Sequence, residues 1–392
     1  MVGTTPDYVD FIRRTRPTEV LFMTAPHLRE RSREETPAPE EEILCPLSDP
    51  EAAGRALRRH LACCGQKLIG VACYDCESLQ LAAFLADRMG LPFPSARSVG
   101  LCRDKYLSQR QWVRQGLPCP RFSLAADADQ ALRFLAGVRA AVIKPLGGSG
   151  SELVFRVANQ EECVEACRHC REGMFLIEEL IEGEEYSCDF AVAGGKASVL
   201  RVTRKYPRPG LPFGTIEAYE LLAPESAPGG LEEICRRAAG ALEIEESICM
   251  LDLIVGDSGP MLLEMAPRPG GACLPLLLRT AGGRDTIGRV LDWAAGRPDR
   301  TPFPAASPLV GLVLHSPGEG RLARLDLSGL TRDPRVLALE ALRREGDEVR
   351  LPPRDYDTWQ LAQLVYRPEP GRPVPEQNRE LAGMWQAELE EQ

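Results

Sequence analysis

The sequence has few histidines and no long apolar run. Its four histidines, His27, His60, His169 and His315, are scattered over 392 residues. Their separation argues against a histidine-ligated metal site and against a Ser–His–Asp triad. No segment approaches the ~20 apolar residues of a membrane-spanning helix, and residues 1–16 lack the apolar core of a secretory signal. We therefore expect a cytoplasmic protein without a membrane partner.

Acidic residues outnumber basic residues, 57 to 47. The net charge of −10 leaves no basic excess for a nucleic-acid surface, so we expect no nucleic-acid partner. Only five of the 47 basic residues are lysines. Because a compact ammonium and a planar guanidinium are not interchangeable, each lysine is a candidate functional residue. The five are Lys67, Lys105, Lys144, Lys196 and Lys205.

The fourteen cysteines do not indicate disulfides or zinc. Most of them lie inside apolar runs of a long chain, which favours reduced thiols. The two Cys-x-x-Cys pairs, Cys73/Cys76 and Cys167/Cys170, are about 90 residues apart, far from the spacing of a zinc ribbon. Cys163, together with the second pair, falls on one face of a predicted helix, so we interpret these cysteines as small core residues.

Two apolar segments each carry one carboxylate. Leu251–Val255 holds Asp252 among aliphatic residues, and Leu262–Gly271 begins with an apolar strand that holds Glu264. Between them, Asp257–Gly259 has the pattern of a three-residue hairpin loop with its glycine in the left-handed conformation. These features predict an antiparallel hairpin.

The hairpin predicts a cation site. If Gly256 faces Pro260, then Asp252 faces Glu264 on the same side of the ladder. Two carboxylates at the end of an apolar hairpin are costly unless positive charge lies between them. We expect a divalent cation there, with Arg268 presented by the proline-stiffened segment that follows.

The first 100 residues alternate strands and helices. Residues 19–23 and 67–73 read as buried parallel strands, with helices over 50–63 and 75–89. A charged, proline-interrupted loop is expected at 29–42. This βαβα order predicts a small doubly wound α/β domain.

A glycine- and serine-rich loop follows the next lysine-bearing strand. A helix over 102–115 starts near Lys105, and the strand 141–145 ends with Lys144. The loop 146–151 offers backbone N–H groups for an anion beside that lysine. A simple hairpin turn with a solvent-exposed lysine is the alternative interpretation.

Two further stretches allow a functional or a structural interpretation. The acidic break at 178–185 suits an adenine amino group and ribose hydroxyls, or is a solvated turn. The strand 199–205 ends in Arg201, Arg204 and Lys205, which either meet a phosphate or carboxylate or lie on a solvated edge. Beyond a boundary at 301–308, strands at 309–315, 336–339 and 360–366 and a helix at 375–392 show no catalytic constellation, so this part is expected to be a structural appendage.

Taken in order, these features resemble the ATP-grasp superfamily over nearly the whole chain. The resemblance implies an α/β (α+β) fold. It implies an N-terminal α/β domain over 1–100, an ATP-grasp domain over 101–303 with a flap at about 120–178, and a C-terminal β-rich module over 308–392 with a terminal helix. A chain of 392 residues is long enough for two or three domains.

The resemblance also assigns residues. It implies magnesium ligands at Asp252 and Glu264 and catalytic roles for Arg268, which would stabilise an acyl phosphate, and Lys205. It implies nucleotide binding by Lys105, Lys144, Gly148, Ser149, Gly150, Ser151, Glu178, Glu179, Leu180 and Glu185.

The implied activity is that of an ADP-forming carboxylate–amine ligase using ATP and Mg²⁺. Its substrates would be a small-molecule carboxylate and amine, as in amino-acid and dipeptide ligases, and a homodimer is common in similar proteins. One departure is Ala266, where most members have a metal-binding Asn. The Glu-x-Ala-Pro-Arg-Pro run also resembles carboxyaminoimidazole ribonucleotide synthase, which activates bicarbonate, although the usual following His-Asn is replaced by Gly270-Gly271. A non-catalytic nucleotide-binding protein is the third interpretation.

Overall fold

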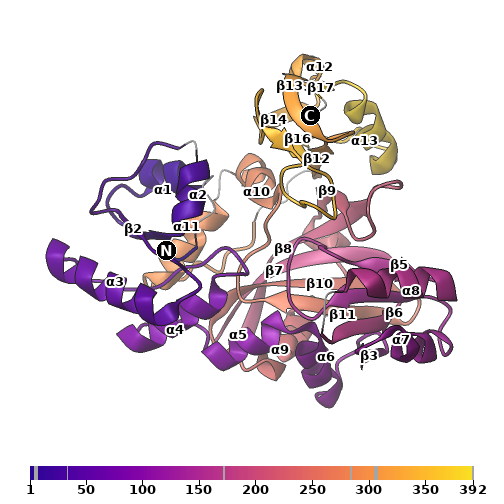
Figure 1. The fold of residues 1–392 in the computed structure, drawn as a ribbon, viewed down its shortest axis with the longest axis horizontal. Helices are drawn as coiled ribbons and strands as arrows, with labels where there is room; N and C mark the ends of the chain where they lie inside the picture. The colour runs from indigo at the N-terminus through magenta and orange to yellow at the C-terminus, as the bar shows by residue number, and fades with distance from the viewer. Residues whose placement is uncertain (4–7, 33, 171–172, 283–284, 304–307, 391–392) are drawn as a thin grey trace.

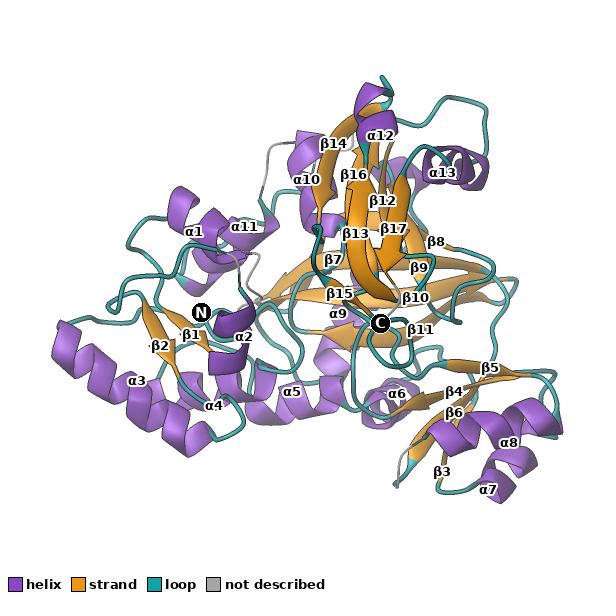
Figure 2. Ribbon diagram, turned by 45° about the horizontal axis from the view of Figure 1, so that its top comes forward, coloured by secondary structure: helices purple, strands orange, loops and turns teal. Residues whose placement is uncertain are grey.

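The computed structural model describes residues 1–3, 8–32, 34–170, 173–282, 285–303 and 308–390. Its central feature is an antiparallel eight-stranded sheet in the order β11-β10-β7-β8-β9-β12-β16-β14 (Figure 2). These strands are β7 (Glu184–Ala193), β8 (Lys196–Pro207), β9 (Ile216–Leu221), β10 (Ser247–Gly256), β11 (Gly259–Ala266), β12 (Leu309–His315), β14 (Val336–Ala341) and β16 (Gln360–Tyr366). The β9–β12 pairing, with Leu309 opposite Leu221, carries the sheet across the boundary expected near residue 301.

One face of this sheet packs on α6 (Lys105–Arg114) and α9 (Leu231–Ala241). The large core here includes Phe190, Leu251 and Trp112, whose indole N–H donates to the carbonyl of Ala238 at 3.2 Å. The expected helix over 102–115 is two helices, α5 (Ala96–Arg103) and α6, because Asp104 is extended and caps α6 by accepting from the N–H of Leu107 at 2.9 Å. This break places Lys105 at the first turn of α6.

A second, four-stranded sheet has the order β3-β6-β4-β5 and carries two helices (Figure 2). Its elements are β3 (Phe122–Ala125), α7 (Ala128–Leu135), β4 (Ala141–Pro145), β5 (Phe155–Val157), α8 (Gln160–His169) and β6 (Phe175–Glu179). Asp127 and Asn159 cap the two helices through their side chains. Cys163 is fully buried in the core between these helices and the sheet, as expected of a small core residue.

The N-terminal unit lies at the left of Figure 1, apart from the four-stranded sheet β3-β6-β4-β5, which we call the flap sheet. It contains α1 (Val9–Thr15), β1 (Phe22–Thr24), α2 (Pro26–Arg31), β2 (Glu42–Leu44), α3 (Pro50–Cys64) and α4 (Leu79–Met89). β1 and β2 are parallel, but the expected strand at 67–73 is reduced to a single bridge between Cys73 and Val2. The expected loop at 29–42 was wrong in part, because it includes the end of α2 and a buried ion pair of 2.6 Å between Arg29 and Glu42.

The C-terminal segment differs from expectation at its end. The predicted terminal helix is α13 (Val374–Ala382) followed by β17 (Gln386–Glu390), which joins β13 (Gly320–Asp326) and β15 (Glu348–Val349) in a small sheet. The helix stops at Gly383, and the alternation of Ala387 and Leu389 with charged residues favours a strand beyond it. Further helices are α10 (Leu274–Gly282), α11 (Thr286–Ala294) and α12 (Ser328–Arg332).

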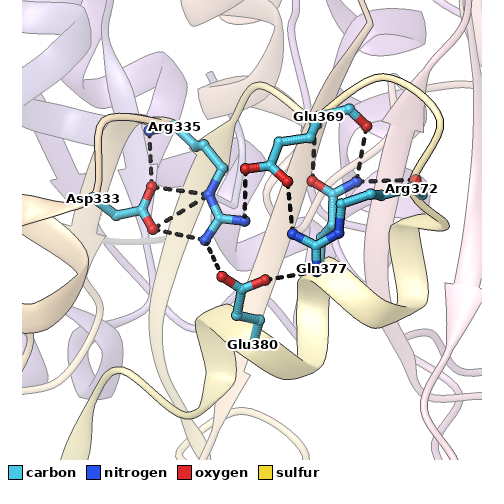
Figure 3. Close-up of polar contacts among 6 residues, drawn as sticks. All are labelled: Asp333, Arg335, Glu369, Arg372, Gln377 and Glu380. Atoms are coloured by element: carbon cyan, nitrogen blue, oxygen red, sulfur yellow. Dashed lines mark hydrogen bonds and ion pairs between the residues drawn. The ribbon is translucent and has the colours of Figure 1, made fainter.

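A polar network fixes α13 to the loops beside it (Figure 3). Arg335 donates to Asp333 at 2.7 Å and to Glu380 of α13 at 3.0 Å. The fully buried Gln377 accepts from the N–H of Glu369 at 2.8 Å.

None of the helices among the described residues combines the length and apolar character needed to cross a bilayer.

Candidate active site

The predicted hairpin forms β10 and β11, and Asp252 does oppose Glu264. The turn is tighter than expected, however, because Gly256 pairs with Gly259 rather than Pro260, which leaves a two-residue loop. Gly259 has the expected positive φ of 92°. A bulge at Leu263 then shifts the register by one residue and restores the Asp252–Glu264 pair.

A cavity of about 510 Å³ lies between this hairpin, the neighbouring strands β7 and β8, and the flap sheet. It contains all the residues expected to bind nucleotide or metal, together with Lys205. The lining includes Lys105, Lys144, Gly148, Ser149, Gly150, Ser151, Glu178, Glu179, Leu180, Glu185, Lys205, Asp252 and Glu264. Residues as far apart in the chain as Lys105 and Glu264 therefore share one site, which is large enough for a small-molecule ligand.

Three of the five lysines converge here, each beside a carboxylate. Lys144 and Glu178 form a buried ion pair of 2.5 Å. Lys205 bonds Asp252 at 2.9 Å and also pairs with Glu185. The remaining two lysines of the chain, Lys67 and Lys196, are exposed. The scarcity of lysine was thus an informative signal.

The lysines shape the charge of the site. Burial opposes the charged form of Lys205, but Asp252 and Glu185 raise its pKa well above the ordinary value. Burial lowers the pKa of Lys105, which lies 3.7 Å from Glu264. For Glu264, burial acts to raise the pKa, yet the surrounding cations, Lys105 foremost, bring it below the ordinary value. The surrounding cations therefore favour the ionised form of Glu264.

The two carboxylates fit a magnesium ion. Asp252 is buried, and its Oδ1 atom has no hydrogen-bond partner, which is costly unless a ligand satisfies it. No group of three or more His, Cys, Asp or Glu side chains within the described ranges is placed to hold a metal. Mg²⁺ commonly takes one or two carboxylates and completes its shell with phosphate oxygens and water. Ala266 adds no ligand; it packs with Cys76 and Met250 in a small apolar cluster.

The Gly/Ser loop (residues 146–151) lines the cavity and makes several hydrogen bonds, although Gly147, Gly148 and Gly150 are exposed. Gly148 accepts from Arg103 at 3.3 Å and from Lys105 at 3.4 Å. Ser149 donates to Glu77 at 2.9 Å, and Ser151 donates to the carbonyl of Gly214 at 2.7 Å. The loop is therefore tied to the N-terminal unit and to the loop after β8.

The residues of the acidic segment 178–185 have different partners. Glu178 is 3% exposed and bonds both Lys144 and the amide of Gln109, the latter at 2.7 Å, so it is not a solvated turn residue. Glu179 instead pairs with the exposed Arg121 at 2.9 Å. The N–H of Leu180 donates to the carbonyl of Ala140 at 3.0 Å and is already used.

Arg201 does not reach the cavities, contrary to one expectation. It is buried in a bidentate ion pair with Asp189, at 2.9 Å for both bonds. Asp189 also accepts from the N–H of Gly270 at 2.8 Å, and a Cβ at Gly270 would collide with the Arg201 guanidinium. This pair therefore anchors the segment that follows Arg268.

We expect Asp189→Asn to destabilise the protein by roughly 3–5 kcal/mol, because it leaves the buried Arg201 uncompensated. Equilibrium urea unfolding measures the change. Glu243→Gln, which removes an exposed partner of Arg97, serves as the control and should leave the midpoint unchanged. An unfolding midpoint of Asp189→Asn equal to that of the control would contradict this anchoring role.

A smaller cavity of about 210 Å³ adjoins the larger one. It shares Lys105, Lys205, Asp252 and Glu264 and adds Arg268. The Arg268 guanidinium donates to the sulfur of Cys76 at 2.9 Å and to the carbonyl of Pro269 at 2.7 Å. Two adjoining cavities thus meet at the carboxylate pair.

The residues that follow the segment 67–73 do not line the smaller cavity. The Tyr74 hydroxyl donates to the Ile287 carbonyl, and Asp75 accepts from the N–H of Ser78 at 2.5 Å. Conversely, the C-terminal part is more than a structural appendage. It contributes Val313, His315, Tyr356, Trp359 and Gln360 to the wall. Nothing in the spacing of these residues signalled their convergence.

Comparison with known proteins identifies a domain family and several relatives. Residues 102–272 match the ATP-grasp domain family. The chain is 25% identical over 249 residues to a D-alanine–D-alanine ligase of Paracidovorax citrulli, covering 56% of this chain and 73% of that protein. Residues 102–272 therefore form an ATP-grasp domain. The named relatives include D-alanine–D-alanine ligase and human carnosine synthase 1, the latter at 27% identity over 248 residues, covering 56% of this chain and 30% of that protein.

The ATP-grasp fold extends over the whole chain. An L-amino acid ligase from Bacillus licheniformis has a TM-score of 0.80 at 19% identity, covering 100% of this chain and 98% of that one. An N5-carboxyaminoimidazole ribonucleotide synthetase from Thermotoga maritima has a TM-score of 0.68 at 17% identity, covering 99% and 98%. The predicted fold class is therefore confirmed. Several other curated relatives are matched over less than half of their own length.

Proposed function

We propose that this ATP-grasp protein joins a carboxylate to an amine through an acyl phosphate, releasing ADP and phosphate, and that both substrates are amino acids. The observation that carries the proposal is the junction of the two cavities at Asp252 and Glu264. The larger cavity has the lysines for a triphosphate, and the smaller one presents Arg268 to an anion on the other side of the same carboxylates.

The residues of the larger cavity would bind and orient ATP. Lys105 and Lys144 would hold phosphate oxygens, with the N–H groups of the Gly/Ser loop beside them. Asp252 and Glu264 would hold Mg²⁺, which supplies charge neutralisation for phosphoryl transfer when bound. Phosphoryl transfer depends mainly on such positioning and electrostatic stabilisation. Lys144 would exchange its partner Glu178 for a phosphate oxygen.

The carboxylate substrate would lie in the smaller cavity beside Arg268. Its oxygen attacks the γ-phosphorus, the bond to the β-phosphate oxygen breaks, and ADP leaves. The amine nitrogen then attacks the acyl carbon, phosphate departs, and the nitrogen loses a proton. Arg268 would stabilise the oxyanion of the tetrahedral species, and the Gly/Ser loop would keep water from the acyl phosphate once it closes over the bound nucleotide.

A phosphate-release screen of L-amino acids, singly and in pairs, with ATP and Mg²⁺ tests the proposal. We expect release that needs a carboxylate and an amine together, and a condensed product by mass spectrometry. Release that proceeds equally without any amine would contradict it. Release that instead requires bicarbonate with an aminoribonucleotide would favour the bicarbonate-activating alternative, whose fold this chain also shares.

A further inference from the structure

One wall of the smaller cavity has no role in the reaction described so far. It comes from β12 and from the loop before β16, and its central residue is His315. Because side chains alternate along a strand, Val313 and His315 share the face of β12 that lines the cavity. The sheet is irregular at this point: Leu314 pairs with Ala362, but His315 pairs with Gln360. Such bulges re-aim side chains next to functional sites.

The imidazole is held in place by aromatic contact. Its ring centroid lies 4.3 Å from that of Trp359, at an interplanar angle of 47°. Trp359 is itself fixed, because its indole N–H donates to the carbonyl of Tyr356 at 3.1 Å and its own carbonyl accepts from the N–H of Ser316 at 2.7 Å. A ring positioned in this way presents a fixed edge to the cavity.

This edge lacks a protein partner within the described part of the chain. His315 is 7% exposed, and its Nδ1 atom is enclosed without a hydrogen-bond partner. Nε2 is therefore the ring nitrogen that the cavity can reach. No hydrogen bond joins Nε2 to a described residue either, so this nitrogen is available to accept a hydrogen bond from a ligand in the cavity.

The charges around the cavity define the ligand. Its charged lining residues are the cations Arg103, Lys105, Lys205 and Arg268 and the carboxylates Asp252 and Glu264. An amine needs a hydrogen-bond acceptor that is not occupied by magnesium. His315 offers a neutral one, because burial, followed by the proximity of Arg208, lowers its pKa to about 4.

We propose that His315 positions the attacking amine. Its Nε2 accepts a hydrogen bond from the amine N–H, which orients the nitrogen lone pair toward the acyl carbon, while the aromatic surface of Trp359 packs against the carbon skeleton of the amine. This inference rests on the proposed ligase function and adds the residue that selects its second substrate.

The experiment separates amine capture from acyl-phosphate formation. His315→Phe retains a ring against Trp359 and removes both nitrogens, and His315→Gln restores an acceptor. Each variant is assayed with the amino-acid pair that releases most phosphate in the screen, and separately with the carboxylate partner and concentrated hydroxylamine, which traps the acyl phosphate as a hydroxamate. We expect His315→Phe to raise the amine KM about tenfold, equivalent to ~1.4 kcal/mol, with hydroxamate formation unchanged. His315→Gln should recover part of the loss.

The outcomes discriminate between the inference and the proposed function. An unchanged amine KM in His315→Phe overturns the role of His315, and so does an equal loss in the amine and hydroxylamine assays. His27→Phe, at the exposed start of α2, is the control and should behave like the parent protein; a matching rise in its amine KM would also overturn the role. Hydroxamate missing in the parent protein would refute the ligase function itself.

Discussion

Replacing Lys144 with methionine is expected to abolish ATP-dependent phosphate release, lowering kcat/KM by at least ~10²–10³-fold. Lys144 is 7% exposed near the end of β4, and it lines the larger cavity, which we propose to bind the nucleotide. Removing a preorganised positive group from a water-poor site costs on the order of 2.7–4 kcal/mol of transition-state stabilisation. Initial rates with the best amino-acid pair measure the loss.

The same substitution should also destabilise the protein, because Glu178 remains buried without its cation. Breaking a buried ion pair from one side costs ~3–5 kcal/mol. The double variant Lys144→Met/Glu178→Gln removes the orphaned charge and should recover most of the stability but none of the activity. Turnover in the double variant at the parental rate would show that Lys144 is only structural. Lys196→Met, at an exposed strand start, is the matched control and should change neither property.

The pairing of Lys144 with Glu178 illustrates what local sequence cannot reveal. Sequence reasoning placed both residues at the nucleotide, which agrees with their position in the cavity wall. Their direct contact depends on the β4–β6 register, in which Lys144 faces Leu176 and Glu178 faces Val142. The two are diagonal neighbours on one face of the sheet. No local pattern fixes such a register between strands 30 residues apart.

The opposition of Asp252 and Glu264 in the β10–β11 hairpin was predicted correctly, but the length of its loop was predicted incorrectly. The Asp-Ser-Gly sequence is compatible with a two-residue or a three-residue loop, since both accept a glycine with positive φ. The structure uses the shorter loop and recovers the register through the bulge at Leu263. The opposing carboxylates could be predicted because burial on one side of an apolar strand tolerates acids only where they are needed.

The wall formed by His315 and Trp359 could not be predicted for a different reason. It exists because β9 pairs with β12, which joins the C-terminal strands to the sheet that carries the site. A proline-rich segment between two regions suggests separate domains, and that interpretation hid the continuity. Non-local strand pairing of this kind leaves no periodic signal in either segment.

Asp252→Asn is expected to remove the magnesium-dependent part of nucleotide binding. The substitution keeps the shape of the side chain but replaces one of the two carboxylates assigned to the metal, and the unpartnered Oδ1 of Asp252 loses its charge. In the parent protein, ADP at ~100 times its Kd should stabilise the fold by ~2.7 kcal/mol. Thermal shifts with ADP, with and without Mg²⁺, measure the effect. In the variant, the two conditions should give equal shifts.

A control variant in the same hairpin tests whether the effect is specific to Asp252. Asp257→Asn lies in the exposed turn of the same hairpin and should retain the full magnesium dependence. The melting temperature of Asp252→Asn without nucleotide should stay close to that of the parent, because Lys205 keeps its ion pair with Glu185. A magnesium-dependent shift in Asp252→Asn as large as in the control would place the metal elsewhere. Ala266 supplies no third ligand that could substitute for the lost carboxylate.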